Sequence, residues 1–454
     1  MDNTVSGTQE KKAPSGKKRS FSGNLKLLIT VLTVTLAVFQ LSTAFFGVLP
    51  AMQQRSLHLA FVLPLIFLLY PMWKTSPKSR PSLFDWVFAA TAAVCTVYVY
   101  FMYEDIANRA GMYTQYELYL GVAMIFLVFE AARRVLGYPL PIFCALFILF
   151  AYYGRSMPGP FKHFGLSIPR IIEELYLTTD GLFGLVTGVS ATYIFLFILF
   201  GAFLSSTGTS QFFNDLSMAL TGHLKGGPAK IAVVSSALMG TISGSTSANV
   251  ATTGAFTIPL MKKAGYTSNF AGAVVAASST GGQIMPPVMG AAAFIMAQFL
   301  GISYWDIVVA AALPATLYFI SIMAMVHFRA GKRGIQSLTE ETAPKVGKVL
   351  KEGWHLLLPI ITLVIFLAMG YSAVKAVFWS IVLMVGVSWM GKPEYRMTPK
   401  RLLDALIAGG MGAVEVAAAC ACSGLVIGVI GITGIGLAFS SFVINLSQGI
   451  LPLA

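Results

Sequence analysis

The sequence predicts an all-α protein that crosses a membrane many times. Of its 454 residues, 56% are hydrophobic and only 11% are charged, and its mean hydropathy is +0.76. A soluble domain carries about 25% charged residues. Apolar runs near the length that spans a bilayer as a helix, about 20 residues, recur along the chain. Because an unpaired backbone amide is costly in hydrocarbon, helices are the expected spanning elements.

The charge of the chain fits a membrane protein better than a nucleic-acid binder. The formal net charge is +13, and most of the basic residues lie in short loops beside apolar runs. Such residues set membrane topology and contact anionic lipids, so we expect the bilayer as a partner and no nucleic acid. The cysteines at 95, 144, 420 and 422 lie inside apolar runs, and we interpret them as small buried hydrophobic residues.

The N-terminal third is expected to form a tail and five spans. Residues 1–24 are polar and rich in Lys, Ser and Gly, which predicts a disordered tail. Its lysines place the N-terminus in the cytoplasm by the positive-inside rule. A first part at 25–156 then holds spans at 27–49, 57–73, 83–103, 116–132 and 139–153.

A linker follows at 157–180. Residues 157–179 combine prolines and charges with isoleucines at roughly helical spacing. We expect an amphipathic helix in the outer interface that separates two parts of the protein. A plain connecting loop is the alternative.

The segment at 226–263 is broken in its middle by small polar residues. It belongs to a predicted first transport repeat at 181–330, which begins with a span at 182–207. Lysines flank both ends of the broken segment, so both ends are assigned to the cytoplasm. A segment with both ends on one side is a re-entrant hairpin. Two short full spans are the alternative, although each arm is short for crossing a bilayer.

A second apolar segment, at 267–301, is also broken. Its polar residues at 278–283 precede Pro286 and Pro287. Interrupted segments of this kind are the best sequence indication of a transporter's binding site. The chain returns to the cytoplasm by a span at 305–328.

The rest of the chain is expected to hold a cytoplasmic linker at 331–352, scaffold helices at 353–401 and the start of a second repeat at 402–454. GLVIG at 424–428 echoes GLVTG at 184–188, in the opposite orientation by the loop charges. This predicts an inverted-repeat fold similar to that of ion transporters. No hairpin follows the second copy, so we expect a C-terminally truncated, incomplete second repeat. Chance similarity between glycine-rich helices is the alternative.

No set of catalytic residues is evident. The 5 histidines are scattered, and no carboxylate pair lies near them in sequence. No glycine-rich run continues into the Gly-Lys-Ser or Gly-Lys-Thr of a phosphate loop. We therefore expect neither an enzyme nor a bound cofactor.

The two breaks offer neutral oxygen atoms, which suit a dehydrated Na⁺ inside a membrane. Glycines there free backbone carbonyls, and helix halves direct their partial charges at the breaks. Close packing of helices through small residues is the alternative. The candidate residues are Ser243, Gly244, Ser245, Thr246, Ser247, Asn249 and Thr252 in the first break, and Ser279, Thr280, Gly281 and Gly282 in the second.

Two carboxylates lie within apolar runs. Glu130 is close to Arg133 and Arg134, which predicts an ion pair at a span end. Glu415 lies deeper in its helix and is a candidate for ion or proton coupling, because a charge at that depth is costly. It could instead face a charged partner in a neighbouring subunit or in the expected missing half of the protein.

The sequences GTISGSTSANV at 240–250 and SSTGGQIMPPVMG at 278–290 closely resemble the large membrane subunit of tripartite ATP-independent periplasmic (TRAP) transporters. The resemblance is closest to the subfamily served by TRAP-associated extracytoplasmic immunogenic (TAXI) binding proteins, and it covers the chain from about residue 182. The first five spans resemble the small membrane subunit fused in front.

This resemblance implies a permease of the bacterial inner membrane that works as an elevator-type secondary transporter. A TAXI-type periplasmic solute-binding protein would deliver an organic acid such as a dicarboxylate, and Na⁺ would be the coupling ion. By position, Ser243, Ser245, Asn249 and Gly281 would hold Na⁺, and Thr280 and Gly282 would help to hold Na⁺ and the substrate carboxylate.

Two other functions stay open at this point. One is an ion-coupled carrier that needs no binding protein. The other is a membrane scaffold fragment that transports nothing.

Overall fold

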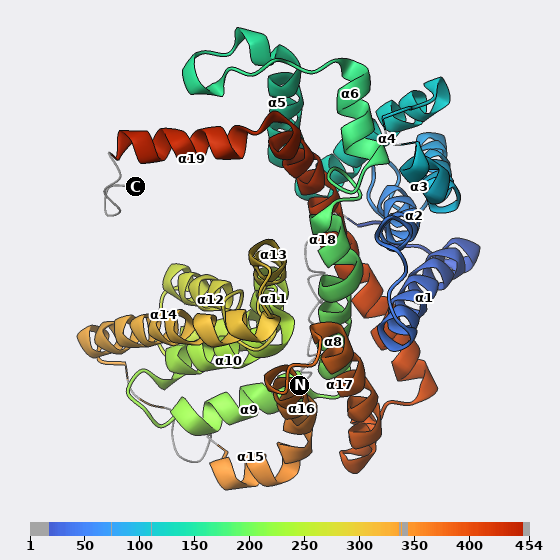
Figure 1. The fold of residues 1–454 in the computed structure, drawn as a ribbon. Helices are drawn as coiled ribbons and strands as arrows, with labels where there is room; N and C mark the ends of the chain where they lie inside the picture. The colour runs from blue at the N-terminus through green and yellow to red at the C-terminus, as the bar shows by residue number, and fades with distance from the viewer. Residues whose placement is uncertain (1–17, 74, 110, 336, 338–343, 448–454) are drawn as a thin grey trace.

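The described part of the chain is helical and has no strand (Figure 1). The computed structural model describes residues 18–447 except 74, 110, 336 and 338–343. Most of the predicted tail and residues 448–454 lie outside the described residues. Within them, nine helical stretches are long and apolar enough to cross a membrane, which confirms the all-α polytopic class. They are Gly23–Phe46, Ala51–Leu69, Leu83–Asn108, Pro139–Ser156, Leu185–Ser206, Tyr304–Arg333, Val346–Ala368, Ala373–Met390 and Pro399–Thr433.

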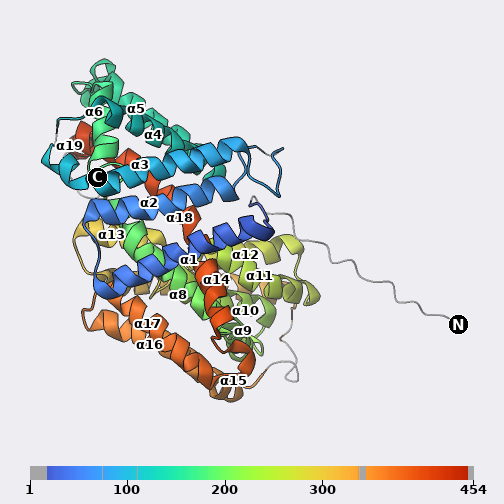
Figure 2. The same ribbon diagram turned by 90° about the vertical axis from the view of Figure 1, so that its right-hand side faces the viewer.

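The first five helices form an N-terminal bundle with α2 near its centre. These helices are α1 (Gly23–Phe46), α2 (Ala51–Leu69), α3 (Leu83–Asn108), α4 (Gln115–Leu136) and α5 (Pro139–Tyr153). α2 packs closely against α3 and also contacts α1 and α4, and α1, α2 and α3 lie side by side in Figure 2. Leu59, Leu63 and Phe67 of α2 are fully buried. Burying each such side chain contributes about 1.5–3 kcal/mol.

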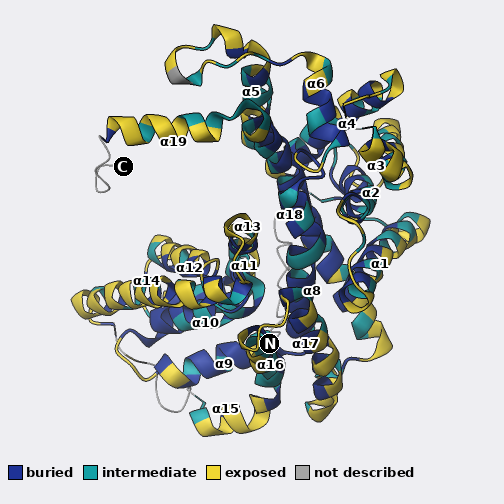
Figure 3. Ribbon diagram, viewed as in Figure 1, coloured by how far each residue is buried: buried dark blue, intermediate teal, exposed yellow. Residues whose placement is uncertain are grey.

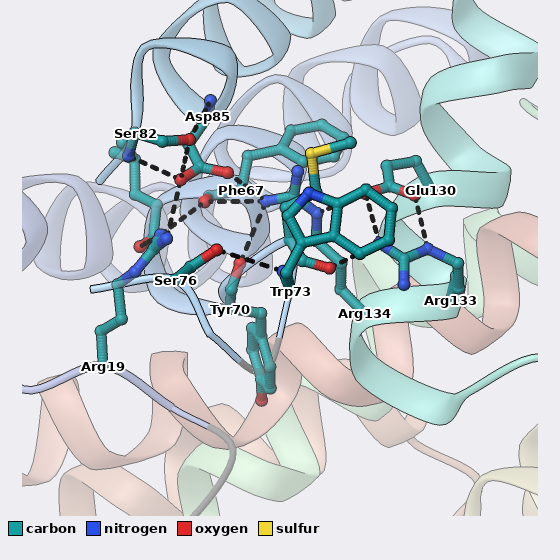
Figure 4. A network of polar contacts seen from close by, with 12 residues as sticks. Arg19, Phe67, Tyr70, Trp73, Ser76, Ser82, Asp85, Glu130, Arg133 and Arg134 are labelled. Atoms are coloured by element: carbon teal, nitrogen blue, oxygen red, sulfur yellow. Dashed lines mark hydrogen bonds and ion pairs between the residues drawn. The ribbon is translucent and has the colours of Figure 1, made fainter. Parts of the chain in front are cut away.

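At one end of this bundle, a buried network of charged side chains connects the segment before α1 to α3 and α4 (Figure 4). The Asp85 carboxylate lies between two guanidinium groups, 2.8 Å from Arg19 Nη2 and 2.6 Å from Arg134 Nη1. Arg134 also pairs with Glu130, which Arg133 contacts at 2.7 Å, so the predicted Glu130 ion pairs are confirmed.

The network holds three arginines but only two carboxylates. The guanidinium groups of Arg19 and Arg134 also donate to the carbonyls of Leu68 and Tyr70, each at 3.0 Å. These carbonyls lie at the C-terminus of α2, where the helix leaves acceptors unpaired and presents a partial negative charge. The end of the helix therefore offsets the excess positive charge.

The long helix α18 (Pro399–Thr433) connects the N-terminal bundle to the rest of the chain. It contacts α1, α2, α4 and α5 on one side and the continuous helix of α7 (Leu185–Val189) and α8 (Phe195–Ser206) on the other. Figure 1 shows it running through the middle of the molecule. Gly409 permits this packing, because a Cβ there would meet the Leu199 side chain. α19 (Ile435–Leu446) follows and has no buried residue.

Residues 227–333 form a compact unit, here called the hairpin unit. It contains α10 (Gly227–Ser243), α11 (Thr246–Lys263), α12 (Ser268–Gly281), α13 (Ala291–Leu300) and α14 (Tyr304–Arg333). Part of the unit packs around its own core, with Ala232, Val275 and Val326 buried in it. Figures 1 and 3 show the unit to one side of α18 with exposed residues on its outer helices.

The chain enters the hairpin unit through α9 (Thr209–Thr221) and leaves it towards α15 (Val346–Gly353). These two connecting helices contact each other. Gly353 of α15 lies so close to the Phe212 ring of α9 that a Cβ would overlap it. After α15 the chain continues into α16 (Leu358–Ala368) and α17 (Ala373–Val387).

The predicted amphipathic helix at 157–179 is much shorter in the structure. Residues 159–161 form a single 3-10 turn, and a continuous helix occurs only in α6 (Ile168–Ile172) and the π-helical turn Glu173–Leu177. Pro169 lies in the first turn of α6, where its missing N–H costs nothing. The prediction is therefore wrong for residues 157–167.

Candidate functional site

The first sequence break is a two-residue turn between two antiparallel helices. α10 ends at Ser243, and Gly244 has a φ of 54°, in the left-handed region that glycine adopts without strain. Ser245 then caps α11, with its Oγ 3.4 Å from the Ala248 amide nitrogen. A Cβ on Gly244 would overlap the Met289 carbonyl oxygen, so the turn lies directly against the second break.

The second break separates α12 from α13 by nine residues with no regular helix, 282–290. Turn hydrogen bonds order it, including one of 2.7 Å from the Gly290 amide to the Gln283 carbonyl. The Tyr304 hydroxyl of α14 donates to the Pro287 carbonyl at 2.9 Å. The break is therefore a folded structure held by its own unit, and it presents its backbone to the hairpin turn.

A close approach of glycines brings α10 against the end of α12. A Cβ on Gly240 would lie 2.6 Å from the Gly282 Cα, and a Cβ on Gly282 would lie 3.1 Å from the Asn249 side-chain nitrogen. Gly282 and Asn249, two predicted site residues, are thus brought together. No larger residue fits between the helices without a backbone shift.

Below the turn, buried polar side chains join α10, α11 and α12. Asn249 Nδ2 donates to the Ser236 carbonyl at 2.8 Å. The Ser236 hydroxyl lies 3.2 Å from Thr253 Oγ1 and 3.5 Å from Ser279 Oγ. All four residues are fully or almost fully buried. Each contact satisfies a polar atom that would otherwise be costly to bury.

Two hydroxyl groups at the turn have no such partner. Ser243 Oγ and Thr246 Oγ1 are buried and accept or donate no hydrogen bond to any described residue. They flank Gly244 and Ser245. An unpaired buried hydroxyl is unfavourable, whereas a hard cation requires oxygen ligands. The pair therefore fits the donor set expected of a Na⁺ site.

Several predicted residues do not join this group. Gly281 faces α14, where a Cβ would lie 2.5 Å from the Tyr318 ring, and its carbonyl accepts from the Ile284 amide. Thr280 is exposed and bonds to the Ala276 carbonyl of its own helix. The contacts of Gly281 are thus with α14 and the second break, and that of Thr280 is with its own helix.

The remaining predicted residues lie on the outer side of the turn. Ser247 is exposed, with its hydroxyl 3.3 Å from that of Ser245. Thr252 Oγ1 donates to the Ala248 carbonyl at 2.9 Å and lines a cavity of about 540 Å³ that faces α9. These groups are accessible to a solute and do not belong to the buried layer.

Sequence reasoning missed Ser236, and it named Thr253 only as an oxygen donor one turn beyond the first break, without placing it in a buried layer. A signal for Thr253 was present, since Asn249, Thr253 and Thr257 recur every four residues and so share one face of α11. All three are buried. Ser236 had no comparable signal, because a single serine in an apolar helix is common.

Glu415 has partners within the same chain. Its Oε1 accepts a hydrogen bond from the Tyr70 hydroxyl at 2.6 Å and pairs with Lys18 Nζ at 2.9 Å. Its side chain is 47% exposed. The charged partner therefore comes from the segment before α1, and Tyr70 comes from the end of α2.

The described residues include no group of three or more His, Cys, Asp or Glu side chains that could hold a metal ion. The candidate site consists instead of hydroxyls, one amide and backbone groups. Its electrostatics are those of dipoles: the C-termini of α10 and α12, which favour a cation, and the N-termini of α11 and α13, which favour an anion, adjoin the two breaks.

Residues 123–453 match the family model of the tripartite ATP-independent periplasmic transporter, DctM component. The sialic acid TRAP transporter large permease protein SiaM of Vibrio cholerae is 30% identical over 166 residues, 36% of this chain and 38% of that protein. The C4-dicarboxylate TRAP transporter large permease protein DctM of Pseudomonas aeruginosa is 27% identical over 168 residues, 37% of this chain and 39% of that protein.

The isethionate TRAP transporter permease protein DctMQ of Oleidesulfovibrio alaskensis is 30% identical over 176 residues. That alignment covers 37% of this chain and 26% of DctMQ. In all three comparisons the aligned region spans less than two fifths of the relative's length.

Proposed function

The chain belongs to the family of the DctM component of tripartite ATP-independent periplasmic transporters, and on this premise we propose that it is the permease of a Na⁺-coupled importer of organic acids. The observation that carries the proposal is the contact between the hairpin turn and the second break. Gly244 lies against Met289 there, and the unpaired hydroxyls of Ser243 and Thr246 lie at the same turn.

An anionic substrate is supported by the names of the relatives. They include permeases for sialic acid, 2,3-diketo-L-gulonate and C4-dicarboxylates. The N-termini of α11 and α13, at the two breaks, favour an anion by their partial positive charge. A small organic acid such as a dicarboxylate is the substrate class that we propose for this chain.

Na⁺ would be transported together with the acid. The oxygen atoms of Ser243 and Thr246 would contribute to its ligands, and the accessible hydroxyl of Ser245 would complete the side of the turn that faces solvent. Asn249 would not bind Na⁺ itself but would hold α11 against α10, and so fix the positions of the ligands. Glu415 is left out of this group because Lys18 and Tyr70 occupy its carboxylate.

Elevator-type movement is supported by how the hairpin unit is connected. Part of it packs around a core of its own, and the chain enters it from α9 and leaves it towards α15. Its other contacts include those of α10 with α8 and of α13 with α7. Such a unit can shift as one body about its two connections. We propose that the bundle of α1–α5, together with α18, is the static part.

The N-terminal bundle takes the place of a separate small membrane subunit in this proposal, although the DctM match begins at residue 123 and so includes most of α4 and all of α5. α18 contacts four of its helices, as a stable fused pair would require. The protein would lie in the bacterial inner membrane with its N-terminus in the cytoplasm, and a TAXI-type periplasmic binding protein would deliver the acid. The echo between 184–188 and 424–428 would reflect an inverted repeat.

Uptake by proteoliposomes tests this function. The protein is reconstituted, supplied with the periplasmic binding protein encoded beside its gene, and given a labelled organic acid under an inward Na⁺ gradient. We expect uptake that requires both Na⁺ and the binding protein. Uptake without the binding protein would favour an ion-coupled carrier, and no uptake under any gradient would favour a scaffold.

A further inference from the structure

A cavity that holds two basic side chains in a largely apolar lining lies apart from the hairpin turn, between the N-terminal bundle and α13. Its volume is about 540 Å³, which is within the usual range for a small-molecule site. The turn between α1 and α2, the start of α7 and the start of α17 form its walls. A smaller cavity of about 190 Å³ adjoins it and shares Tyr193, Gln298 and Ser372.

The charged side chains that line this cavity are all positive among the described residues. Arg55 and Lys375 line it, and none of the described residues that line it is Asp or Glu. The Arg55 guanidinium rests on Gly188, where a Cβ would lie 2.7 Å from Nε, and donates to the Phe183 carbonyl at 2.6 Å. Asp180 acts on Arg55 through space, but it lines a different cavity.

The positive-inside rule does not explain the position of either Arg55 or Lys375. By the loop charges, the α1–α2 turn and the turn before α17 are on the outer side, where basic residues are normally scarce. The hydrogen-bonding groups beside them are neutral: Gln298 Nε2 donates to the Tyr193 hydroxyl at 3.3 Å. Two cations with neutral donors and no lining carboxylate match the chemistry of a carboxylate anion.

We propose that this cavity is an outer anion-binding vestibule, in which Arg55 and Lys375 hold the carboxylate of an organic acid before it reaches the hairpin turn. The identity of the anion as substrate rests on the proposed function. The binding chemistry does not, because neither Na⁺ nor the residues of the turn take part. Gln298, on α13, would report contact between the vestibule and the hairpin unit.

The test measures the charge selectivity of the cavity directly. Gln298, which is exposed, is replaced by cysteine (Q298C), and its reaction with an anionic and a cationic thiosulfonate reagent is timed from the outer side without Na⁺. The native cysteines are all buried, so the parent chain gives the background. We expect the anionic reagent to react faster, and succinate to slow it more than succinamide does.

Charge variants in the Q298C background then assign the effect. Lys375→Gln, at an exposed position, and Arg55→Gln should each lower the anionic-to-cationic rate ratio by about fivefold, because each removes a nearby unit charge. Lys162→Gln, an exposed lysine outside the cavity, should leave the ratio unchanged.

An unchanged ratio in Lys375→Gln would overturn the proposal even if Arg55→Gln failed to fold. Equal protection by succinate and succinamide would also overturn it. Variants of the hairpin turn could lose uptake while the anionic-to-cationic rate ratio stays unchanged. That result would support the vestibule and place the loss of uptake at the proposed transport site.

Discussion

The side-chain amide of Asn249 donates a 2.8 Å hydrogen bond to the main-chain carbonyl of Ser236, and so joins the two arms of the hairpin beneath its turn. Asn249 is the first buried residue of α11 and Ser236 lies two turns before the end of α10. The bond fixes the distance between the arms, and with it the positions of Ser243 and Thr246 at the turn.

Replacing Asn249 with alanine should therefore loosen the turn as well as remove a polar group. Loss of a buried hydrogen bond costs about 1–3 kcal/mol when a partner is left unsatisfied. We expect a lower midpoint of thermal unfolding and a weaker dependence of uptake on Na⁺. Ser321→Ala is the control, since Ser321 is exposed and bonds only within α14. Equal behaviour of the two variants would argue against the role of Asn249.

Gly240→Ala tests the close approach of α10 to Gly282. The added methyl would lie 2.6 Å from the Gly282 Cα, and overpacking of this kind costs about 1–3 kcal/mol. The matched variant is Gly272→Ala on α12, where a Cβ meets nothing within 4 Å. We expect Gly240→Ala to lower the thermal midpoint and Gly272→Ala to keep or raise it. The opposite order would show that the helices do not meet at Gly240.

Asp85→Asn should destabilise the N-terminal bundle strongly. It removes the carboxylate between Arg19 and Arg134, and an uncompensated buried charge costs about 3–5 kcal/mol. Asp105→Asn, at an exposed position of the same helix, is the control and should change stability by less than about 0.5 kcal/mol. Unfolding in detergent measures both, and similar midpoints would contradict the network in Figure 4.

Glu415→Gln tests whether Glu415 couples transport to an ion or only holds the segment before α1 and the end of α2 against α18. The glutamine can keep the hydrogen bond to Tyr70 and loses only the charge that pairs with Lys18. Because the pair is partly exposed, we expect a small loss of stability, about 0–1 kcal/mol, and an unchanged affinity for Na⁺. Lys18→Gln should have a similar effect. A large loss of Na⁺ affinity in Glu415→Gln alone would restore Glu415 as a coupling residue.

The fold class and the two breaks could be predicted from the sequence because the bilayer restricts both. Hydrocarbon requires long apolar helices, and a polar interruption at 243–249 or 278–283 stands out against them. The turn needed glycine at a left-handed position, and Gly244 provides it. These features depend on residues close together in the chain, where pattern is informative.

The contacts across the site could not be predicted in the same way. Gly281 and Gly282 are equivalent in sequence, yet one faces Tyr318 and the other Asn249. Asp85 is separated from Arg19 by 66 residues and from Arg134 by 49, so no local pattern connects them. The same holds for Ser236 and Ser279, which meet only once α10 and α12 have packed.

Na⁺ binding to the purified protein tests the central claim most directly. The measurement is the thermal midpoint in NaCl relative to choline chloride, supported by equilibrium binding of radioactive sodium. It compares the parent chain, Ser243→Ala, Thr246→Ala and Ser321→Ala. Bound ligand at 100 times its Kd stabilises a protein by about 2.7 kcal/mol. We predict that Na⁺ stabilises the parent and Ser321→Ala, and that Ser243→Ala and Thr246→Ala lose most of this effect. Equal stabilisation of all four proteins by Na⁺, or of none, would contradict a sodium site at the hairpin turn.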